Sequence, residues 1–300
     1  MPELPEVEVL VRHLAPLLKN KTIQHVHINR ERVLAGTPPQ KLRKALRGAT
    51  FESLARRGKY LRFELRAANQ AVTLPLLGHL GMTGRMYLLP SNSPLPKHAA
   101  VVLDLGSENF VFEDTRYFGK FTLDTTALDE LGPEPLGPEF TPENLTSALK
   151  RSSQPIKVKL LDQCVVAGVG NIYASEALFL ACISPSRQSN TLRLPQVHRL
   201  CGAIKKVLVE AINRGSTVPL NLSGNGTRDG LFYYGSAPGA SASLEERLRV
   251  YDREGKPCFT CGTPILRVIQ AARSTFYCPQ CQRAARASSE VKHRSRKSLA

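Results

Sequence analysis

CFTCGTPILRVIQAARSTFYCPQC, which runs from Cys258 to Cys281, is the most specific stretch of the sequence. It holds two C-x2-C pairs separated by sixteen residues. Four thiolates at this spacing can close a tetrahedron around one Zn²⁺ ion, in a structural site without an open position. A redox pair or a chance pairing is the alternative interpretation. The pattern therefore predicts a zinc finger whose ligands are Cys258, Cys261, Cys278 and Cys281.

The residues between the two cysteine pairs predict a small ribbon. ILRVIQ and STFY are rich in β-branched and aromatic residues, so we expect two strands joined by a turn. The ribbon carries Arg267 and Arg273, and a small basic ribbon suits contact with a DNA groove or phosphates. A long loop dense in Gly and Ser precedes the finger at 213–243, and loops of this length are usually functional or mobile. The basic residues 284–300 are expected to be a disordered tail.

Upstream of the finger, the segment LGPEPLGPEF at 131–140 separates a part of the chain with strand-like patterns from a part with helical periodicity. An amphipathic helix is predicted over 5–18, and the short β-branched and aromatic stretches after it predict an antiparallel sandwich or barrel. After the linker, the apolar period is helical at 142–150, 156–164, 171–181 and 194–213. We therefore expect a β-rich domain at 1–131, a linker at 132–140, a helical domain at 141–243, the finger at 244–283 and the tail at 284–300.

Charge and cysteine content limit the classes of protein. The net charge of +16 predicts attraction to polyanions, nucleic acid first among them, although a merely basic protein has the same charge. No stretch has the ~20 apolar residues of a membrane span. The acidic, amphipathic start is neither a signal nor a transit peptide, so we expect an intracellular protein. Seven cysteines without a secretory signal argue against disulfides, and we expect Cys164, Cys182 and Cys201 in the core.

Two further segments carry candidate chemistry. In VVAGVGNIYASEALF, Gly168 and Gly170 permit an unusual backbone, and Asn171 is expected to cap the next helix. The free N–H groups of such a helix can bind a phosphate, although an ordinary capped turn has the same pattern. The chain starts MPELPEVEVL, where Pro2 and the nearby acids alone would indicate an ordinary helix N-terminus.

Seven segments, taken in order along the chain, resemble those of the formamidopyrimidine-DNA glycosylases, which are bacterial repair enzymes for oxidised purines. The segments are MPELPEVE, RRGKYL, GHLGMTG, PLPKH, FEDTRYFG, GVGNIYASE and FYCPQCQ. The resemblance covers Met1 to about Arg283. It implies an α+β multidomain fold: an N-terminal β-sandwich flanked by helices, then a helix–two-turn–helix module and a β-ribbon zinc finger. It also implies a monomer in the bacterial cytoplasm that holds one structural Zn²⁺ and acts on double-stranded DNA with oxidised bases or abasic sites.

The resemblance implies a covalent mechanism. Once Met1 is removed, Pro2 is a terminal secondary amine whose pKa near ~8 leaves a useful neutral fraction to attack the sugar C1′. Glu3 is then the general acid at the ribose, and Glu6 orients the site. Lys59 contacts phosphate and donates a proton in β-elimination. Arg273 grips the flanking phosphates and assists δ-elimination.

The family's DNA contacts also map onto this chain. His79, His98 and Asn171 match DNA contacts, Arg151 is a candidate phosphate contact, and Lys157 matches a lysine near the damaged-base pocket. The target nucleotide must be flipped out of the duplex and the gap filled. The three filling residues implied are Met82, Arg116 and Phe118, with Arg116 facing the orphaned base, preferably cytosine.

The chain departs from the family pattern at three places. Ala100 stands where a second histidine often follows His98, and Tyr117 stands where Arg or Lys is commonest. The Gly/Ser loop around 216–239, expected to be the lid over the flipped base, also differs from the usual versions. These departures concern DNA contacts near His98, the wedge and lesion preference.

Three other functions are alternatives to an oxidised-purine glycosylase. An endonuclease VIII-like enzyme for oxidised pyrimidines would share Pro2, Glu3, Lys59 and the finger, but Leu4, Met82 and the long loop favour the purine branch. A non-catalytic damage binder should have lost one of these catalytic residues, and all are present. A basic zinc protein with a structural role leaves the N-terminal residues unexplained.

Overall fold

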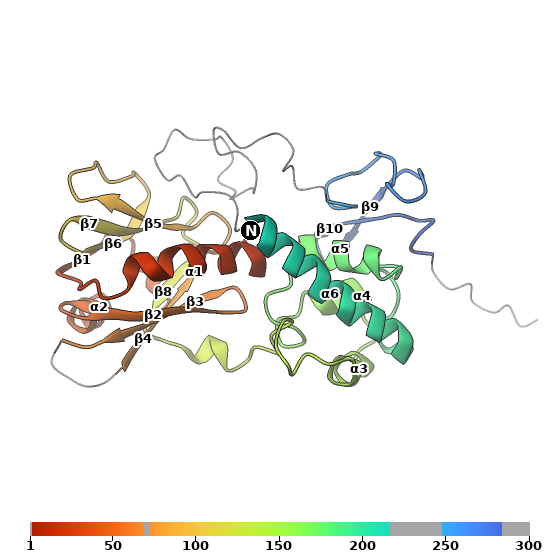
Figure 1. Cartoon of the computed structure of the whole chain (residues 1–300), viewed down its shortest axis with the longest axis horizontal. Helices are drawn as coiled ribbons and strands as arrows, with labels where there is room; N and C mark the ends of the chain where they lie inside the picture. The colour runs from red at the N-terminus through yellow and green to blue at the C-terminus, as the bar shows by residue number, and fades with distance from the viewer. Residues whose placement is uncertain (1, 69–72, 216–247, 284–300) are drawn as a thin grey trace, which may run out of the picture.

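The computed structural model describes residues 2–68, 73–215 and 248–283. Figure 1 shows strands in the N-terminal half, helices in the C-terminal half, and the ribbon beside the helices. Met1, the expected lid around 216–239 and the expected tail at 284–300 lie outside the described residues. Over the described ranges, no helix combines the length and apolar character needed to cross a membrane.

The N-terminal half is a sandwich of two antiparallel sheets. The first, in spatial order, contains β2 (Thr50–Arg57), β3 (Tyr60–Arg66), β4 (Thr73–His79) and β8 (Lys120–Thr122). The second contains β1 (His25–Ile28), β6 (Ala99–Asp104), β7 (Glu108–Glu113) and β5 (Arg85–Pro90). Phenylalanine rings fill the core, at Phe51, Phe63, Phe110, Phe112 and Phe121. The β-sandwich that the family resemblance implies is therefore confirmed, and the fold is not the barrel that the sequence patterns also allowed.

Short elements that the sequence patterns did not single out complete this half. They are α2 (Pro39–Leu46), the 3-10 turns η1 (Glu31–Leu34) and η2 (Thr126–Leu128), and strand β5. Helix α2 is short and mostly polar, with Leu42 and Leu46 as its buried residues. A helix of two turns with two apolar contacts gives too weak a periodic signal to be read from sequence.

Helix α1 (Leu4–Leu18) joins the two halves. Its residues Val7, Leu10 and Leu14 pack in the sandwich core. One turn earlier, Leu4 is fully buried in the core of the helical half instead. Figure 1 shows the start of α1 at the centre of the molecule, next to the helices. A single helix therefore belongs to both hydrophobic cores.

The helical half contains α3 (Pro142–Lys150), α4 (Ile156–Leu160), α5 (Asn171–Leu180), the turn η3 (Ser189–Thr191) and α6 (Leu194–Gly215). Helix α4 is shorter than expected, because the Asp162 carboxylate accepts the Cys164 N–H at 3.0 Å and forms a turn there. Cys164 is consequently exposed, which corrects the expectation that it is a core residue. Cys182 is also exposed, since it leaves α5 at φ +56°, whereas Cys201 is buried as expected.

The ribbon consists of β9 (Leu266–Gln270) and β10 (Arg273–Tyr277), which pair antiparallel. Ala271 and Ala272 connect them, with φ of +46° and +57°, in the left-handed conformation of a tight two-residue hairpin turn. The finger packs on the helical half through Phe179 of α5, which shares a small core with Val250, Ile265 and Phe276.

Leu4→Ala should destabilise the protein by about 2–4 kcal/mol, because it opens a cavity in a fully packed core. Leu17→Ala, on the same helix but 41% exposed, is the matched control and should change stability by less than about 0.5 kcal/mol. Denaturant unfolding of both variants measures the difference. Equal effects would show that the start of α1 does not anchor the helical half.

Candidate active site

Glu3 connects the chain's start to helix α5. The buried carboxylate accepts hydrogen bonds from the backbone N–H of Ile172 at 2.9 Å and of Tyr173 at 3.3 Å. A carboxylate at a helix N-terminus is favoured by these unpaired donors and by the helix dipole. The N-cap is Gly170, not Asn171 as expected, and these N–H groups are taken by Glu3 instead of a phosphate.

Two glycines make room for this contact. A Cβ at Gly170 would lie 2.3 Å from the Glu3 side chain, so a larger residue there would displace the carboxylate. Gly168 has φ +85°, and a Cβ there would lie 2.7 Å from Leu4. The Gly168 carbonyl also accepts the Leu4 N–H at 3.1 Å. The GVG sequence therefore serves the close approach of α1.

Glu6 lies behind Glu3. One of its oxygens accepts the backbone N–H of Glu3 at 2.8 Å, and the other accepts the Tyr173 hydroxyl at 2.8 Å. Burial, followed by the negative charge of Glu3, raises the pKa of Glu6 to about 7. The residue thus fixes the backbone at Glu3 and changes charge close to neutral pH.

Lys59 occupies the second position of the tight turn between β2 and β3, after Gly58, whose φ is +58°. Its side chain is buried. Burial lowers the pKa of Lys59, the Glu3 carboxylate opposes that shift, and Arg273 adds to it. The structure therefore brings Lys59, Glu3, Glu6 and Arg273 into one electrostatic environment.

The finger strand β10 is attached to the helices next to Arg273. The Ser274 carbonyl accepts the Lys157 ammonium and the Asn171 amide, each at 3.0 Å, and Lys157 also donates to the Thr275 hydroxyl at 2.9 Å. Lys157 is buried, which lowers its pKa to about 7. In this structure, Lys157 holds the finger. The buried Asn171 Oδ1 has no hydrogen-bond partner within the described ranges.

Both predicted histidines lie in the strand-rich half. His79 Nδ1 accepts the Gly81 N–H at 3.0 Å, so its proton sits on Nε2. Burial, with Lys59 and Lys120 nearby, lowers the pKa of His79 to about 4, which keeps the ring neutral. His98 Nδ1 lies 3.3 Å from the Tyr117 hydroxyl.

The three expected filling residues gather on the surface. Met82 is 40% exposed and Phe118 49% exposed, and the Arg116 guanidinium lies 3.5 Å from the Met82 sulfur and 5.8 Å from the Phe118 ring centre. Large exposed apolar side chains of this kind are available to a partner. Tyr117, which follows Arg116 and departs from the family pattern, has the Arg30 guanidinium over its ring, 5.4 Å from the ring centre.

Arg151 lies in the helical half. It is exposed just after α3, where it lines a hollow of about 490 Å³ with Pro133, Glu139 and Cys164. None of the residues lining that hollow hydrogen-bonds to Glu3 or Lys157. The structure thus does not bring Arg151 into the cluster around Glu3.

The four finger cysteines fit a zinc ion. Their sulfur atoms all lie within 4.8 Å of one another, and three of the pairs are 3.5, 3.5 and 3.9 Å apart. A tetrahedral site with Zn–S bonds of about 2.3 Å has sulfur–sulfur edges of roughly 3.8 Å. Backbone N–H groups of Thr260 and Cys281 point at two of the sulfurs, as is typical of thiolates that bind a metal.

Several supporting residues were not identified from the sequence. The buried Asp114 accepts the Thr83 hydroxyl and the N–H groups of Arg116 and Gly119, and so holds the loop with the filling residues. The buried Glu176 accepts three consecutive N–H groups at 249–251, where the finger segment begins. Glu176 gives no signal of its own in the sequence, because its partners are backbone groups distant along the chain.

Comparisons with known proteins agree with this architecture. Residues 1–121 match the formamidopyrimidine-DNA glycosylase N-terminal domain, 131–220 the H2TH domain of the same enzymes, and 255–284 the zinc finger found in FPG and IleRS. A formamidopyrimidine-DNA glycosylase of Carboxydothermus hydrogenoformans is 39% identical, over 94% of this chain and 100% of the relative. One from Symbiobacterium thermophilum is 41% identical, over 94% and 89%.

Solved structures give the same result. The Lactococcus lactis formamidopyrimidine-DNA glycosylase bound to DNA with an AP site has a TM-score of 0.79, 31% identity, and 94% and 100% coverage of the two chains. A G226P mutant of the L. lactis enzyme in complex with Fapy-dG DNA has a TM-score of 0.81 at 31% identity.

The fold and the site define a zinc-finger DNA glycosylase with a β-sandwich and a helix–two-turn–helix module. The chain belongs to the formamidopyrimidine-DNA glycosylase family. The predicted family, fold class, enzyme class and single structural zinc are thereby confirmed.

Removing zinc with a chelator should raise the Kd for duplex DNA by at least about tenfold, because the ribbon carrying Arg273 loses its fold. Adding Zn²⁺ back should restore binding. Cys261→Ala should behave like the chelated protein, whereas Cys182→Ala, at an exposed cysteine outside the cluster, should bind zinc and DNA normally. Unchanged affinity in metal-free protein would contradict this role of the finger.

Glu6→Gln should alter how stability depends on pH. Between the ordinary value of 4.5 and the pKa of about 7, folded protein keeps a proton on Glu6 that unfolded protein releases. Wild-type stability should therefore fall as pH rises through this window, by up to about 3 kcal/mol, and level off above it. Gln imitates the protonated acid and should remove that slope in denaturant unfolding at each pH. Glu52→Gln, at an acid whose side chain is 45% exposed, should keep that slope.

Proposed function

We propose that the protein is a bifunctional DNA glycosylase and AP lyase of base excision repair, which removes formamidopyrimidines and 8-oxoguanine opposite cytosine. The observation that carries this proposal is the site around Glu3. That acid follows Pro2 directly, is fixed on helix α5, and shares its surroundings with the buried Lys59. A nucleophile, an acid and a cation are thus held together at the junction of the two halves.

The first chemical step is attack of the neutral Pro2 amine on C1′ of the flipped nucleotide. The C1′–base bond breaks and the base leaves with its electron pair. The amine nitrogen releases its proton to the Glu3 carboxylate, which passes it to the ribose ring oxygen as the ring opens. The nitrogen then forms a cationic iminium with C1′, since a secondary amine has no further proton to lose.

The iminium draws electrons and so permits strand cleavage. Loss of a C2′ proton expels the 3′-phosphate, and a second elimination expels the 5′-phosphate. Lys59 contacts phosphate and donates a proton during the first elimination, and Arg273 binds the phosphates flanking the lesion. Water finally hydrolyses the iminium and releases the amine.

We assign recognition of the damaged DNA to side chains outside the group of reacting residues. Met82 and Phe118 fill the gap that the flipped nucleotide leaves, and Arg116 faces the orphaned cytosine. The neutral His79 offers its Nε2–H, and His98 and the Asn171 side chain lie beside the DNA path. Because the substrate is chromosomal DNA and the relatives named above are bacterial, we place the enzyme in the bacterial cytoplasm.

An oxidised pyrimidine is the second candidate substrate. The L. lactis enzyme has been crystallised with Fapy-dG DNA and also with DNA containing an oxidised pyrimidine. Both lesions should therefore be presented to the protein in the functional experiment.

A borohydride trap tests the lyase chemistry. Incubation with duplex DNA carrying 8-oxoguanine opposite cytosine, followed by borohydride, should give a covalent band on a denaturing gel. A copy extended by one residue before Pro2 should give none, because its terminal amine is no longer the proline. Mass spectrometry of the wild type confirms that Met1 has been removed.

The outcomes separate the candidates. Equal trapping by the extended copy would exclude Pro2 as the nucleophile. Trapping only on the oxidised pyrimidine would assign the protein to the pyrimidine branch. If no covalent band forms with either lesion or with an abasic site, while DNA binding is intact, the protein is a non-catalytic binder.

A further inference from the structure

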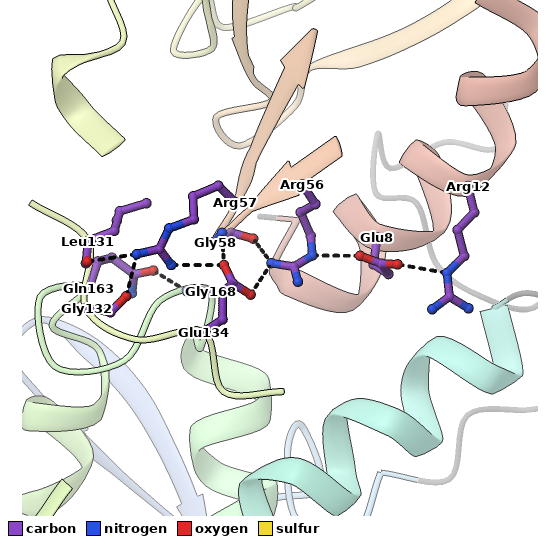
Figure 2. Close-up of polar contacts among 10 residues, drawn as sticks. All are labelled: Glu8, Arg12, Arg56, Arg57, Gly58, Leu131, Gly132, Glu134, Gln163 and Gly168. Atoms are coloured by element: carbon purple, nitrogen blue, oxygen red, sulfur yellow. Dashed lines mark hydrogen bonds and ion pairs between the residues drawn. The ribbon is translucent and has the colours of Figure 1, made fainter. Parts of the chain in front are cut away.

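A chain of charged side chains crosses from α1 to the linker without touching the reacting groups (Figure 2). Arg12 and Arg56 each donate to one oxygen of Glu8 at 2.8 Å. Arg56 also forms an ion pair with Glu134 of the linker at 2.7 Å, and Arg57 donates to the same carboxylate at 3.1 Å. We call these five residues the Glu134 network.

The Glu134 network holds the turn that carries Lys59. Glu134 Oε1 accepts the backbone N–H of Gly58, the residue directly before Lys59, at 2.6 Å. Arg56 donates to the Gly58 carbonyl at 3.1 Å. One linker carboxylate therefore fixes both the backbone of the turn and the two arginines that precede it.

The same linker continues to the backbone that seats Glu3. Arg57 donates to the carbonyls of Leu131 at 2.9 Å and Gly132 at 2.7 Å. The Gly132 N–H donates to the Gln163 carbonyl at 2.8 Å, and the Gln163 side chain accepts the Gly168 N–H at 2.9 Å. Gly168 in turn binds the Leu4 N–H, next to Glu3. Figure 2 shows the residues of this series from Arg57 to Gly168.

The burial of the network distinguishes it from ordinary surface ion pairs. The side chains of Arg56 and Glu134 are 10% and 24% exposed. Burial alone would raise the pKa of Glu8, but the hydrogen bonds from Arg56 and Arg12 outweigh it and keep that pKa below its ordinary value. Partly buried ion pairs whose members also bind backbone groups have defined geometry, whereas exposed pairs contribute little.

We propose that Glu134 is a positioning residue, which sets Lys59 at the tip of its hairpin relative to Glu3 across the two halves of the protein. The inference rests on the proposed function, because it concerns the lysine of that lyase step. Glu134 acts through Lys59 and contacts no DNA. Its loss leaves the hairpin paired but releases the turn from the linker.

A double-mutant cycle on a pre-formed abasic site tests this role. Glu134→Ala should lower the single-turnover strand-cleavage rate at saturating enzyme by about 10- to 100-fold, since misplacement of a reacting group by about 1 Å has effects of that size. The Kd for DNA should change by less than about twofold. In a Lys59→Ala background, Glu134→Ala should have no further effect, because the group it positions is gone.

Controls separate positioning from general instability. Glu134→Gln keeps an oxygen for the Gly58 N–H and should recover part of the rate. Glu52→Ala removes a more exposed acid of strand β2, whose partner Arg66 on β3 is 3.8 Å away, and should leave the rate unchanged. Should Glu134→Ala fail to fold, Glu134→Gln and Arg57→Lys carry the same cycle, since each keeps part of the contacts.

Two results would overturn the proposal: an unchanged rate in Glu134→Ala, whatever its melting temperature, or additive losses with Lys59→Ala. Wild-type protein in the same assay distinguishes this failure from failure of the proposed function, since a wild type that does not cleave abasic DNA refutes the function itself. Amide exchange at Gly58 and Gly168 gives a readout without DNA. Both amides should exchange faster in Glu134→Ala than in Glu52→Ala.

Discussion

The contact between the Glu3 carboxylate and the start of helix α5 constrains much of the surrounding structure. It requires a glycine at position 170, since a side chain there would occupy the space of the carboxylate. It draws the first turn of α1 so close to the helical half that Leu4 joins that half's core. The second residue of the chain is thereby placed beside elements that lie far away in the sequence.

The same burial determines the charge state of the site. Two acids, Glu3 and Glu6, share a small volume with Lys59, Lys157 and Arg273. Burial shifts each of the affected groups toward its neutral form, raising the pKa of Glu6 and lowering the pKa of both lysines. Phosphates entering the site would favour the charged lysines, so binding of DNA and protonation of the lysines are linked.

The sequence predicted those features that depend on local patterns. Cysteine spacing identified the metal ligands, and periodicity located the four helices of the second half, of which 142–150 has the observed bounds. It failed where long-range contacts decide the outcome. Asn171 looked like a helix cap, but Glu3, far away in sequence, occupies those N–H groups. The bond from the Lys157 ammonium to the finger backbone could not be predicted either, because the two groups are far apart in the sequence. No local pattern specifies such partners.

Three of the cations predicted to contact DNA are held in a similar way. Lys59, Arg116 and Arg273 each lie on or beside a tight turn or loop, where a side chain can reach a partner but the backbone is poorly constrained. In each case a polar side chain fixes that backbone: Glu134 for Lys59, the nearby Asp114 for Arg116, and Lys157 with Asn171 for Arg273. The turns allow the cationic side chains to reach a partner, and the polar groups fix the backbone from which those side chains extend. Because the fixing groups of Lys59 and Arg273 come from the linker and the helices, both cations keep their positions only while the separate parts of the chain remain docked.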